Sequence, residues 1–377
     1  MAAFVRTFTK RVFIVSNVLL VICFLLACTN SFLNPQKFWF IAVLGLAFPF
    51  LLVLNLAFII FWLIFRSRWA LLSLVALLLS FTNVRALIGF NFSSEFALKK
   101  DSNTLRILTW NVQWFDEQTK KDKSQKSRRK EMLSFIDDQN ADVLCFQEFL
   151  EANQHKKASY SNINDITELG YPYHYWVRDH EISWGLYNAG VAIFSKFPLT
   201  DTVRIQYSWQ AIRPAAESLI SADIIFRGKT LRIFTTHLQS VLLRQDDYRN
   251  LEKIKSADDS MVEASRFILN KLKRGYHFRA SQAQLVRDKL DESPHPEIIC
   301  GDFNDVPNSY TYFKIKGDRQ DAFIEQGAGL GRTYRYVSPT LRIDYLLADD
   351  RFVVTQVKRT VLPYSDHYPV ITDLQWR

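Results

Sequence analysis

Long apolar runs dominate the first hundred residues of the chain. Two charge-free runs, 12–36 and 38–65, and a third run from Trp69 to about Phe92 each exceed the roughly 20 residues that a helix needs to cross the apolar core of a bilayer. Such runs have no polar face to show to water, which disfavours a buried soluble helical domain. The pattern predicts three transmembrane helices, at about 12–33, 38–65 and 69–92.

A second interpretation of the N-terminus stays open. Leu25, Leu26 and Ala27 precede Cys28 after a basic start, which resembles a bacterial lipoprotein cleavage site, and cleavage there would remove the first segment. Because two more apolar segments would make a lipid anchor redundant, three spans are the favoured interpretation. Pro49 lies midway in the second run, where neighbouring helices can satisfy the carbonyl that a kink frees.

From Thr104 onward the apolar runs shorten to strand length, and polar, turn-rich stretches separate them. These runs predict strands at 105–111, 142–147, 190–194, 218–226, 230–237, 297–302, 342–347 and 368–374. Apolar residues three and four apart predict helices at about 129–139, within 261–272 and at 280–290. Strands outnumber helices, and Arg227-Gly228 is typical of a hairpin turn, so a mixed or antiparallel sheet sandwich flanked by helices is favoured over a doubly wound parallel sheet.

Charge divides the chain into two parts, 1–100 and 101–377. The first hundred residues hold nine basic residues and one acidic residue, Glu95, so +8 of the total net charge of +9 lies there. The high basicity therefore does not indicate a nucleic-acid-binding protein. A hydrophobic content of 48% excludes disorder, and four cysteines are too few for a disulfide scaffold. We expect a membrane domain over 1–100 and one α/β domain over 101–377.

Basic residues near the span ends predict the orientation. One side of three spans would hold Arg6, Lys10, Arg11, Arg66 and Arg68, and the other would hold Lys37, Lys99 and Lys100. The more basic side faces the cytoplasm. The expected localisation is thus the bacterial inner membrane, as an integral protein with the C-terminal domain on the non-cytoplasmic side.

Polar residues gather where the predicted strands end. Six blocks carry them: WNV at 110–112, QE at 147–148, THL at 236–238, GDFN at 301–304, RIDYLL at 342–347 and SDHYPV at 365–370. A strand core has little use for carboxylates and amides, although a single one at a strand end is more often a turn or cap residue. If the strand ends converge, one cleft holds a set of oxygen ligands with few nitrogens and no thiolate, which suits Mg²⁺, Mn²⁺ or Ca²⁺ rather than zinc.

This ordered set of blocks resembles the endonuclease/exonuclease/phosphatase superfamily of deoxyribonuclease-like, metal-dependent phosphoesterases. The resemblance covers about 103–377 and implies a four-layer α/β sandwich, two mixed sheets face to face with helices outside. With the apolar segments, the expected fold class is α/β, a four-layer sandwich preceded by three transmembrane helices. The resemblance further implies hydrolysis of phosphodiesters or phosphomonoesters with Mg²⁺, or with Mn²⁺ or Ca²⁺ in its place.

The resemblance implies roles for particular residues. The implied metal ligands are Glu148, Asn111 and Asp366. The implied catalytic residues are Asp302, which orients or deprotonates the attacking water, the pair His367 and Asp344, and the phosphate contacts His237 and Asn304. Asn188 stands where the family often places a substrate contact, but asparagine is equally common in turns.

Two other classes of function are a binding module and a transporter. A catalytically silent, membrane-attached binding module with the same fold would be indicated by loss of a ligand, and here every expected position holds a competent residue. A transporter is disfavoured because the spans carry one ionisable residue, Arg85. The substrate stays open among nucleic acid, phospholipid and inositol phosphate. The near-neutral domain argues mildly against long nucleic acid, while the basic stretch 120–130, expected as a loop, could hold a polyanion or touch membrane lipid.

Overall fold

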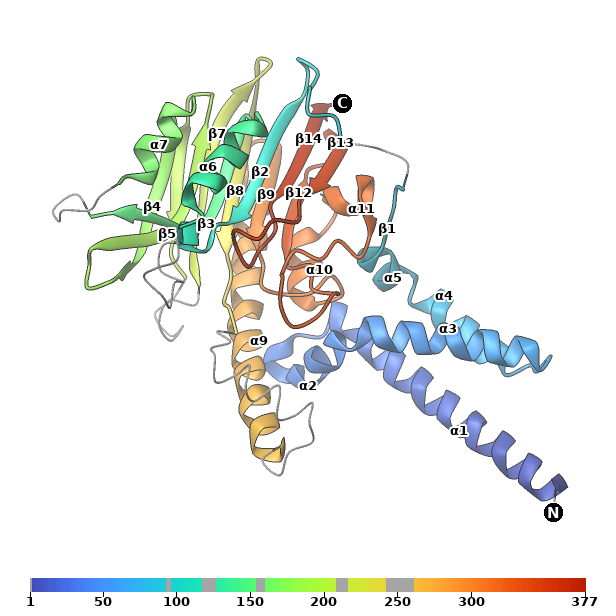
Figure 1. Cartoon of the computed structure of the whole chain (residues 1–377). Coiled ribbons are helices and arrows are strands. Elements are labelled where there is room, and N and C mark those ends of the chain that lie inside the picture. The colour runs from blue at the N-terminus through green and yellow to red at the C-terminus, as the bar shows by residue number, and fades with distance from the viewer. Residues whose placement is uncertain (1, 93–95, 117–126, 154–159, 208–215, 242–260) are drawn as a thin grey trace. The chain divides into compact units, whose positions relative to one another are not determined.

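The computed structural model describes residues 2–92, 96–116, 127–153, 160–207, 216–241 and 261–377 (Figure 1). The contacts between these residues form two compact units. The first comprises described residues within 1–87, 243–280 and 306–314, and the second those within 88–242, 281–305 and 315–377.

The first unit contains the apolar helices of the N-terminal part. They are α1 (Ala2–Cys28), α2 (Pro35–Leu46), α3 (Phe48–Ile64), α4 (Ala70–Leu79) and α5 (Phe81–Leu87). By length and composition, α1 can cross a membrane alone. The pairs α2/α3 and α4/α5 are bent by 54° and 69°, and each reaches the length of a span only when its two helices are counted together, which brings the number to three.

The second and third predicted spans are therefore not straight helices. Pro49 lies in the first turn of α3, where its missing N–H costs nothing, so the chain turns at Ala47 rather than kinking inside one helix. Buried polar side chains join the apolar helices. Ser73 Oγ donates to Asn17 Oδ1 at 2.7 Å, and Asn55 Nδ2 donates to the Ser73 carbonyl at 3.0 Å. Such hydrogen bonds hold apolar helices together without a charge.

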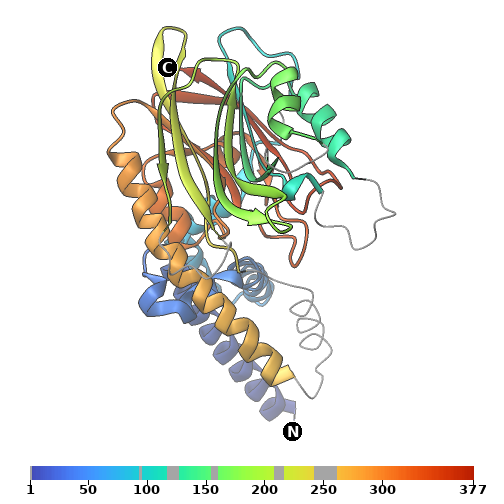
Figure 2. The same cartoon turned by 90° about the vertical axis from the view of Figure 1, so that its left-hand side faces the viewer.

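Two mixed sheets of six strands make up the second unit (Figures 1 and 2). The first sheet has the order β13-β14-β2-β3-β5-β4, with β13 (Phe352–Arg359), β14 (Val370–Trp376), β2 (Leu105–Asn111), β3 (Val143–Ala152), β5 (Tyr187–Ser195) and β4 (Tyr173–Ile182). The second has the order β10-β12-β9-β8-β7-β6, with β10 (Gln320–Asp321), β12 (Asp344–Ala348), β9 (Glu297–Asp302), β8 (Lys229–His237), β7 (Glu217–Phe226) and β6 (Thr200–Ile205). β2 and β3 pair in parallel, as do β8 and β9, and we name the sheets the β2–β3 sheet and the β8–β9 sheet after these pairs.

The two sheets pack face to face over an apolar core to which both contribute, for example Ile107, Val143, Ile233 and Ile298. Helices α6 (Arg129–Asp138) and α7 (Asn162–Glu168) cover the outer face of the β2–β3 sheet, where they bury Met132 and Ile166. The last turns of α9 (Met261–Asp291) lie along the β8–β9 sheet (Figure 2). The remaining short elements are the 3-10 helices η1 (Thr29–Ser31) and η2 (Gln113–Asp116), β1 (Gly89–Phe90), α10 (Tyr310–Lys316), α11 (Ala322–Gln326) and β11 (Ala328–Gly329). This is the four-layer α/β sandwich that the sequence predicts.

Every predicted strand is present, with small shifts of its ends. The predicted hairpin is confirmed: Phe226 pairs with Lys229, and the two residues between them, Arg227 and Gly228, have φ of 58° and 74°. The helices predicted within 261–272 and at 280–290 are a single helix, α9, because apolar residues continue at helical spacing through Tyr276. Most of the basic stretch 120–130 lies outside the described residues.

Candidate active site

The register of the β8–β9 sheet places four ionisable residues in one row at the same end of the sheet. Glu217 pairs with His237, His237 with Asp302, and Asp302 with Asp344, across β7, β8, β9 and β12. In the facing sheet, Asn111 is the last residue of β2 and pairs with Gln147 of β3, the residue before Glu148. All of these residues are in the second unit. The strand ends therefore converge as the sequence predicts.

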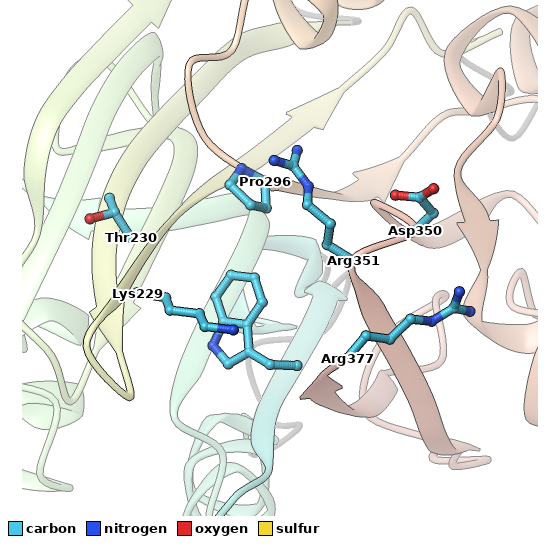
Figure 3. Close-up of a pocket in the computed structure, with 7 residues that line it drawn as sticks. Lys229, Thr230, Pro296, Asp350, Arg351 and Arg377 are labelled. Atoms are coloured by element: carbon cyan, nitrogen blue, oxygen red, sulfur yellow. The ribbon is translucent and has the colours of Figure 1, made fainter.

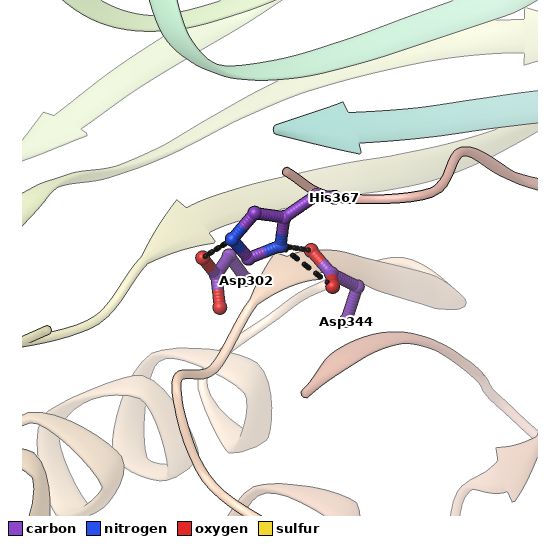
Figure 4. A group of neighbouring side chains, drawn as sticks. All are labelled: Asp302, Asp344 and His367. Atoms are coloured by element: carbon purple, nitrogen blue, oxygen red, sulfur yellow. Dashed lines mark hydrogen bonds and ion pairs between the residues drawn. The ribbon is translucent and has the colours of Figure 1, made fainter. Parts of the chain in front are cut away.

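Carboxylates and imidazoles alternate along this row once His367 is included, which comes from the segment before β14 and lies between Asp302 and Asp344. Asp344 Oδ2 lies 2.9 Å from His367 Nδ1, and His367 Nε2 lies 3.6 Å from Asp302 Oδ2 (Figure 4). The same oxygen of Asp302 lies 3.6 Å from His237 Nε2, and His237 Nδ1 lies 3.2 Å from Glu217 Oε2. Two imidazole Nε2 atoms thus face one oxygen of Asp302, each ring held from behind by a carboxylate.

The carboxylates around the two rings determine their charge. Burial alone would lower the pKa of His367, but the negative charges of Asp344 and Asp302 raise it well above the ordinary value. Burial likewise opposes the charged form of His237, and the adjacent carboxylate of Glu217, together with the charge of Asp302, raises the pKa to about 9. These pKa shifts favour the cationic form of both rings near neutral pH, in which each ring carries a proton on both nitrogens.

A β-bulge positions Glu148. The register of β3 against β5 shifts between Phe146 and Phe149, and Glu148 has φ of 50°, in the left-handed region that few residues other than glycine adopt. The backbone N–H of Glu148 donates to Glu217 Oε2 at 2.8 Å. Asn111 Nδ2 donates to Glu148 Oε1 at 3.2 Å and to Asp302 Oδ2 at 3.1 Å. One amide thereby ties the bulge to the row of ionisable residues.

The charge balance of the cluster favours a cation. Five carboxylates, those of Glu148, Glu217, Asp302, Asp344 and Asp366, surround two imidazolium rings, which gives 2 − 5 = −3 when all are ionised. Burial raises the pKa of Glu148 to about 7, and the charges of Asp366 and Glu217 add to the rise. A bound divalent cation would offset this repulsion, and a set of carboxylate and amide oxygens is the ligand set that Mg²⁺ takes.

Asp302, Asp344 and His367 offer ligand atoms within 4.8 Å of one another, yet they fit a cation poorly (Figure 4). Each ring nitrogen of His367 faces a carboxylate, and a protonated ring has no lone pair for a metal. Glu148 and Asp366 are the better candidates, because each has a pKa raised by burial and they repel one another. Asn111 supports Glu148 through its Nδ2, while its Oδ1 accepts from the backbone N–H of Gln113 at 3.1 Å.

Hydrogen bonds from the β2–β3 sheet fix the segment that carries Asp366 and His367. Trp110 Nε1 donates to the His367 carbonyl at 2.9 Å. Ser365 Oγ donates to the Asn111 carbonyl at 2.8 Å, and the Asp366 N–H donates to Gln113 Oε1 at 3.0 Å. Both sheets therefore determine where the ring of His367 lies.

Two predicted residues differ from expectation in their surroundings. β9 ends at Asp302, so Asn304 is not on a continued strand face; its φ is 53°, and its Nδ2 donates to the Leu238 carbonyl at 3.0 Å. Its backbone N–H donates to Asp302 Oδ1 at 2.8 Å, so Asn304 lies beside the cluster in a turn. Asn188 is buried on β5, and its Oδ1 has no hydrogen-bond partner within the described part of the chain.

Glu217 is the residue that the sequence interpretation missed. It is buried, contacts His237 and holds the backbone of Glu148. The predicted hairpin contains a signal for it, because a two-residue turn at Arg227-Gly228 places the start of β7 opposite the end of β8. Counting back from the turn indicates the residue next to Glu217 as the partner of His237, and the one-residue bulge in this pair of strands shifts the pairing to Glu217.

Replacing Glu217 with glutamine is expected to lower the pKa of His237 from about 9 toward or below its ordinary value of 6.5, because burial then acts without the main opposing charge. The ring would become neutral near pH 7. Histidine resonances followed by NMR against pH measure the change directly. Glu181→Gln, an exposed carboxylate on β4, is the control. An unchanged His237 titration in Glu217→Gln would show that Glu217 does not set the charge of the ring.

A cavity of about 500 Å³ lies elsewhere in the second unit (Figure 3). Lys229, Arg351 and Trp376 are among the residues that line it. Lys229 begins β8, whereas His237 ends it, so this cavity is at the opposite end of the strands from the ionisable cluster. It takes no part in the site described above.

Comparison with known protein families agrees with the sandwich fold and with the cluster of ionisable residues at its strand ends. The family model described as Endonuclease/Exonuclease/phosphatase family matches residues 108–367. The chain belongs to this family, whose members hydrolyse phosphoester bonds and are typically dependent on divalent metals. A second model, described as a domain of unknown function, matches residues 10–87. No curated protein matches the sequence significantly.

Solved structures share the fold at low sequence identity. An endonuclease/exonuclease/phosphatase from Beutenbergia cavernae is 17% identical with a TM-score of 0.51, and the match covers 73% of this chain and 72% of that protein. The human Nocturnin catalytic domain with bound sulfate is 18% identical with a TM-score of 0.51, over 76% of this chain and 98% of that domain. These similarities show the sandwich fold and leave the substrate undetermined.

Proposed function

We propose that this protein is a membrane-attached hydrolase of phosphodiester or phosphomonoester bonds that uses a divalent metal ion. The observation that supports the proposal most is the position of Asp302, whose Oδ2 accepts from Asn111 and faces His237 Nε2 and His367 Nε2 at 3.6 Å each. A buried carboxylate between two cationic donors can hold a water molecule on one side while the donors bind the oxygens of a phosphoryl group.

The chemistry of the chain's own residues follows from these charges. Burial raises the pKa of Asp302, and His367 and His237 oppose the rise. As a base, Asp302 takes a proton from water as the water oxygen attacks phosphorus and the bond to the leaving oxygen breaks. His237 and His367 donate to the phosphoryl oxygens, where negative charge grows in the transition state. Asp344 and Glu217 keep the two rings charged and oriented.

The proposed metal ligands are Glu148 and Asp366, with Asn111 positioning Glu148. A cation there would polarise a phosphoryl oxygen and offset the negative charge of the cluster. Mg²⁺ or Mn²⁺ suits these oxygen ligands best. Asn304 and Asn188 are proposed substrate contacts, Asn304 from the turn beside Asp302 and Asn188 through its buried, unpaired Oδ1.

The purified full chain in neutral detergent is expected to hydrolyse at least one phosphoester in a panel of DNA, RNA, phospholipids and inositol phosphates when Mg²⁺ is present. Excess EDTA should abolish the reaction, because the cluster offers no side chain that replaces a Lewis acid, and added Mn²⁺ should restore it. Product analysis identifies the bond that is cleaved. Hydrolysis that continues at the same rate in EDTA would refute the metal-dependent mechanism.

Membrane attachment is proposed from α1, which is long and apolar enough to span a bilayer, and from the two bent helix pairs. With three spans, we propose that the second unit lies outside the cytoplasm of a bacterial cell, because the more basic side of the spans is expected to face the cytoplasm. A reporter that is active only outside the cytoplasm, fused after Arg377, should be active. A reporter fused there that works only in the cytoplasm would contradict this orientation.

A further inference from the structure

The first half of α9 combines exposed apolar and basic side chains on its surface. Val262 is 66% exposed and Phe267 is 47% exposed. The basic residues Arg266, Lys271, Lys273 and Arg274 accompany a single acidic residue, Glu263, between residues 261 and 274. A helix of this composition is typical of the surface of an anionic membrane.

Several of these cations lie over aromatic rings. Lys273 Nζ is 5.3 Å from the ring centre of Trp39 in α2, and Lys271 Nζ is 5.1 Å from that of Phe267. A lysine in this position lays its alkyl chain on apolar surface and keeps its ammonium group toward water. Lysine and tryptophan are both found in this way at the boundary between lipid and water. The boundary region would therefore include both α2 and α9.

A cavity of about 400 Å³ lies between α2 and α9, which belong to the same compact unit. Its lining residues are Trp39, Met261, Val262, Ser265, Arg266, Leu269 and Asn270. Gln36 Nε2 donates to the His277 carbonyl at 3.3 Å and joins the two helices beyond the cavity. Residues 262, 266, 269 and 273 form one stripe along α9, because residues three and four apart share a helix face.

We propose that this cavity binds an anionic phospholipid. The apolar side chains of Trp39, Val262 and Leu269 would contact the acyl chain, and Arg266 and Lys273 would bind the phosphate of the headgroup. An acidic peptide would leave the exposed apolar surface uncovered, whereas a lipid satisfies both parts of the surface. The same unit contains the apolar helices α1, α3 and α4, so lipid would surround this part of the molecule.

The proposal rests on the membrane attachment proposed above and not on the hydrolase activity. The fusion reporter tests attachment, and the binding measurement below is made in detergent with EDTA, so the failures of attachment, activity and lipid binding can be distinguished. EDTA also keeps metal out of the active site, so that a phospholipid substrate is not hydrolysed during the measurement.

The full chain in neutral detergent is titrated with dioctanoyl phosphatidylglycerol, with dioctanoyl phosphatidylcholine and with inorganic phosphate. Each basic residue near an anionic lipid contributes about a factor of five to affinity. The double variant Arg266→Gln/Lys273→Gln should therefore bind phosphatidylglycerol about 30-fold more weakly than the wild type. Phosphatidylcholine should bind more weakly than phosphatidylglycerol, and inorganic phosphate should not displace the lipid.

Two control variants separate the role of Arg266 and Lys273 from the effects of net charge and of folding. Arg6→Gln/Lys10→Gln removes the same charge from exposed positions of α1 and should leave the affinity within about twofold of the wild type. Arg266→Lys/Lys273→Arg keeps both charges and should retain binding, which separates lost charge from lost folding. Equal affinity for the two lipids, displacement by inorganic phosphate, or wild-type affinity in Arg266→Gln/Lys273→Gln would each overturn the proposal.

Discussion

Replacing Asp302 with asparagine is expected to lower kcat for phosphoester hydrolysis by about 10²–10⁴-fold, the range over which a positioned acid or base contributes to rate. The change keeps the shape of the side chain, but the single amide oxygen can accept only one of the two hydrogen bonds that Asp302 takes from Asn111 Nδ2 and the Asn304 backbone N–H, one on each carboxylate oxygen. It removes the one carboxylate that two imidazoles face. Binding of substrate should survive, because His237 and His367 keep their other carboxylate partners, Glu217 and Asp344.

Thermal unfolding separates this loss from a folding defect. Burial raises the pKa of Asp302, so its charged form opposes folding, while the attraction of His367 and His237 offsets part of that cost, and the midpoint of Asp302→Asn should stay close to that of the wild type. Asp350→Asn, in an exposed turn, is the control. Combining Asp302→Asn with His367→Ala should cost much less than the product of the two single effects. Full activity in Asp302→Asn would show that another group activates water.

Replacing Glu148 with glutamine is expected to weaken Mg²⁺ or Mn²⁺ binding by at least about 10²-fold, more than the loss of an outer-shell partner costs. Activity should fall in proportion at low metal concentration and recover in part when metal is raised. Isothermal titration calorimetry measures the affinity independently of turnover. Glu168→Gln, an exposed change at the end of α7, should leave the affinity unchanged.

The same measurement repeated against pH tests the ionisation of Glu148. Without metal its pKa is raised to about 7, so protons compete with the metal below that pH. Wild-type affinity should therefore rise as pH increases from about 6 to about 8, and Glu148→Gln should lose that part of the dependence. An equally steep dependence in the variant would place the titrating group elsewhere, with Asp366 as the next candidate.

The sequence predicted the central strands because each contains a run of mostly apolar residues, and it missed strands at the sheet edges. β4, β6 and β13 are edge strands, and every residue of β6 is exposed or half-buried. An edge strand has one edge without a paired strand and one face exposed to solvent, so its sequence contains no continuous apolar run to detect. The bends after α2 and α4 were also missed, since an apolar run reveals its length and not the direction of its axis.

The candidate site could be predicted as far as the strand ends and no further. The position of Asp302 at the end of an apolar strand is visible in the sequence, but its two imidazole neighbours depend on the pairing of β8, β9 and the segment before β14. Glu217 follows from the register of a hairpin, which contains a bulge that the sequence does not reveal. The turn at Asn304 is likewise a local backbone choice rather than a pattern of apolar residues.

The bulge in β3 changes which residues alternate along that strand. In a regular strand, residues two apart face the same way, but Phe146 and Phe149 both pack on the helix side although they are three apart. Gln147 and Glu148 consequently both project from the other face, where Gln147 bonds Thr235 and Glu148 accepts from Asn111. A deletion of one residue at this point would straighten the strand and turn the carboxylate away from the cleft. Two aromatic residues spaced by three within an apolar strand, with two polar residues between them, are therefore a pattern by which such an inserted carboxylate can be sought in other sequences.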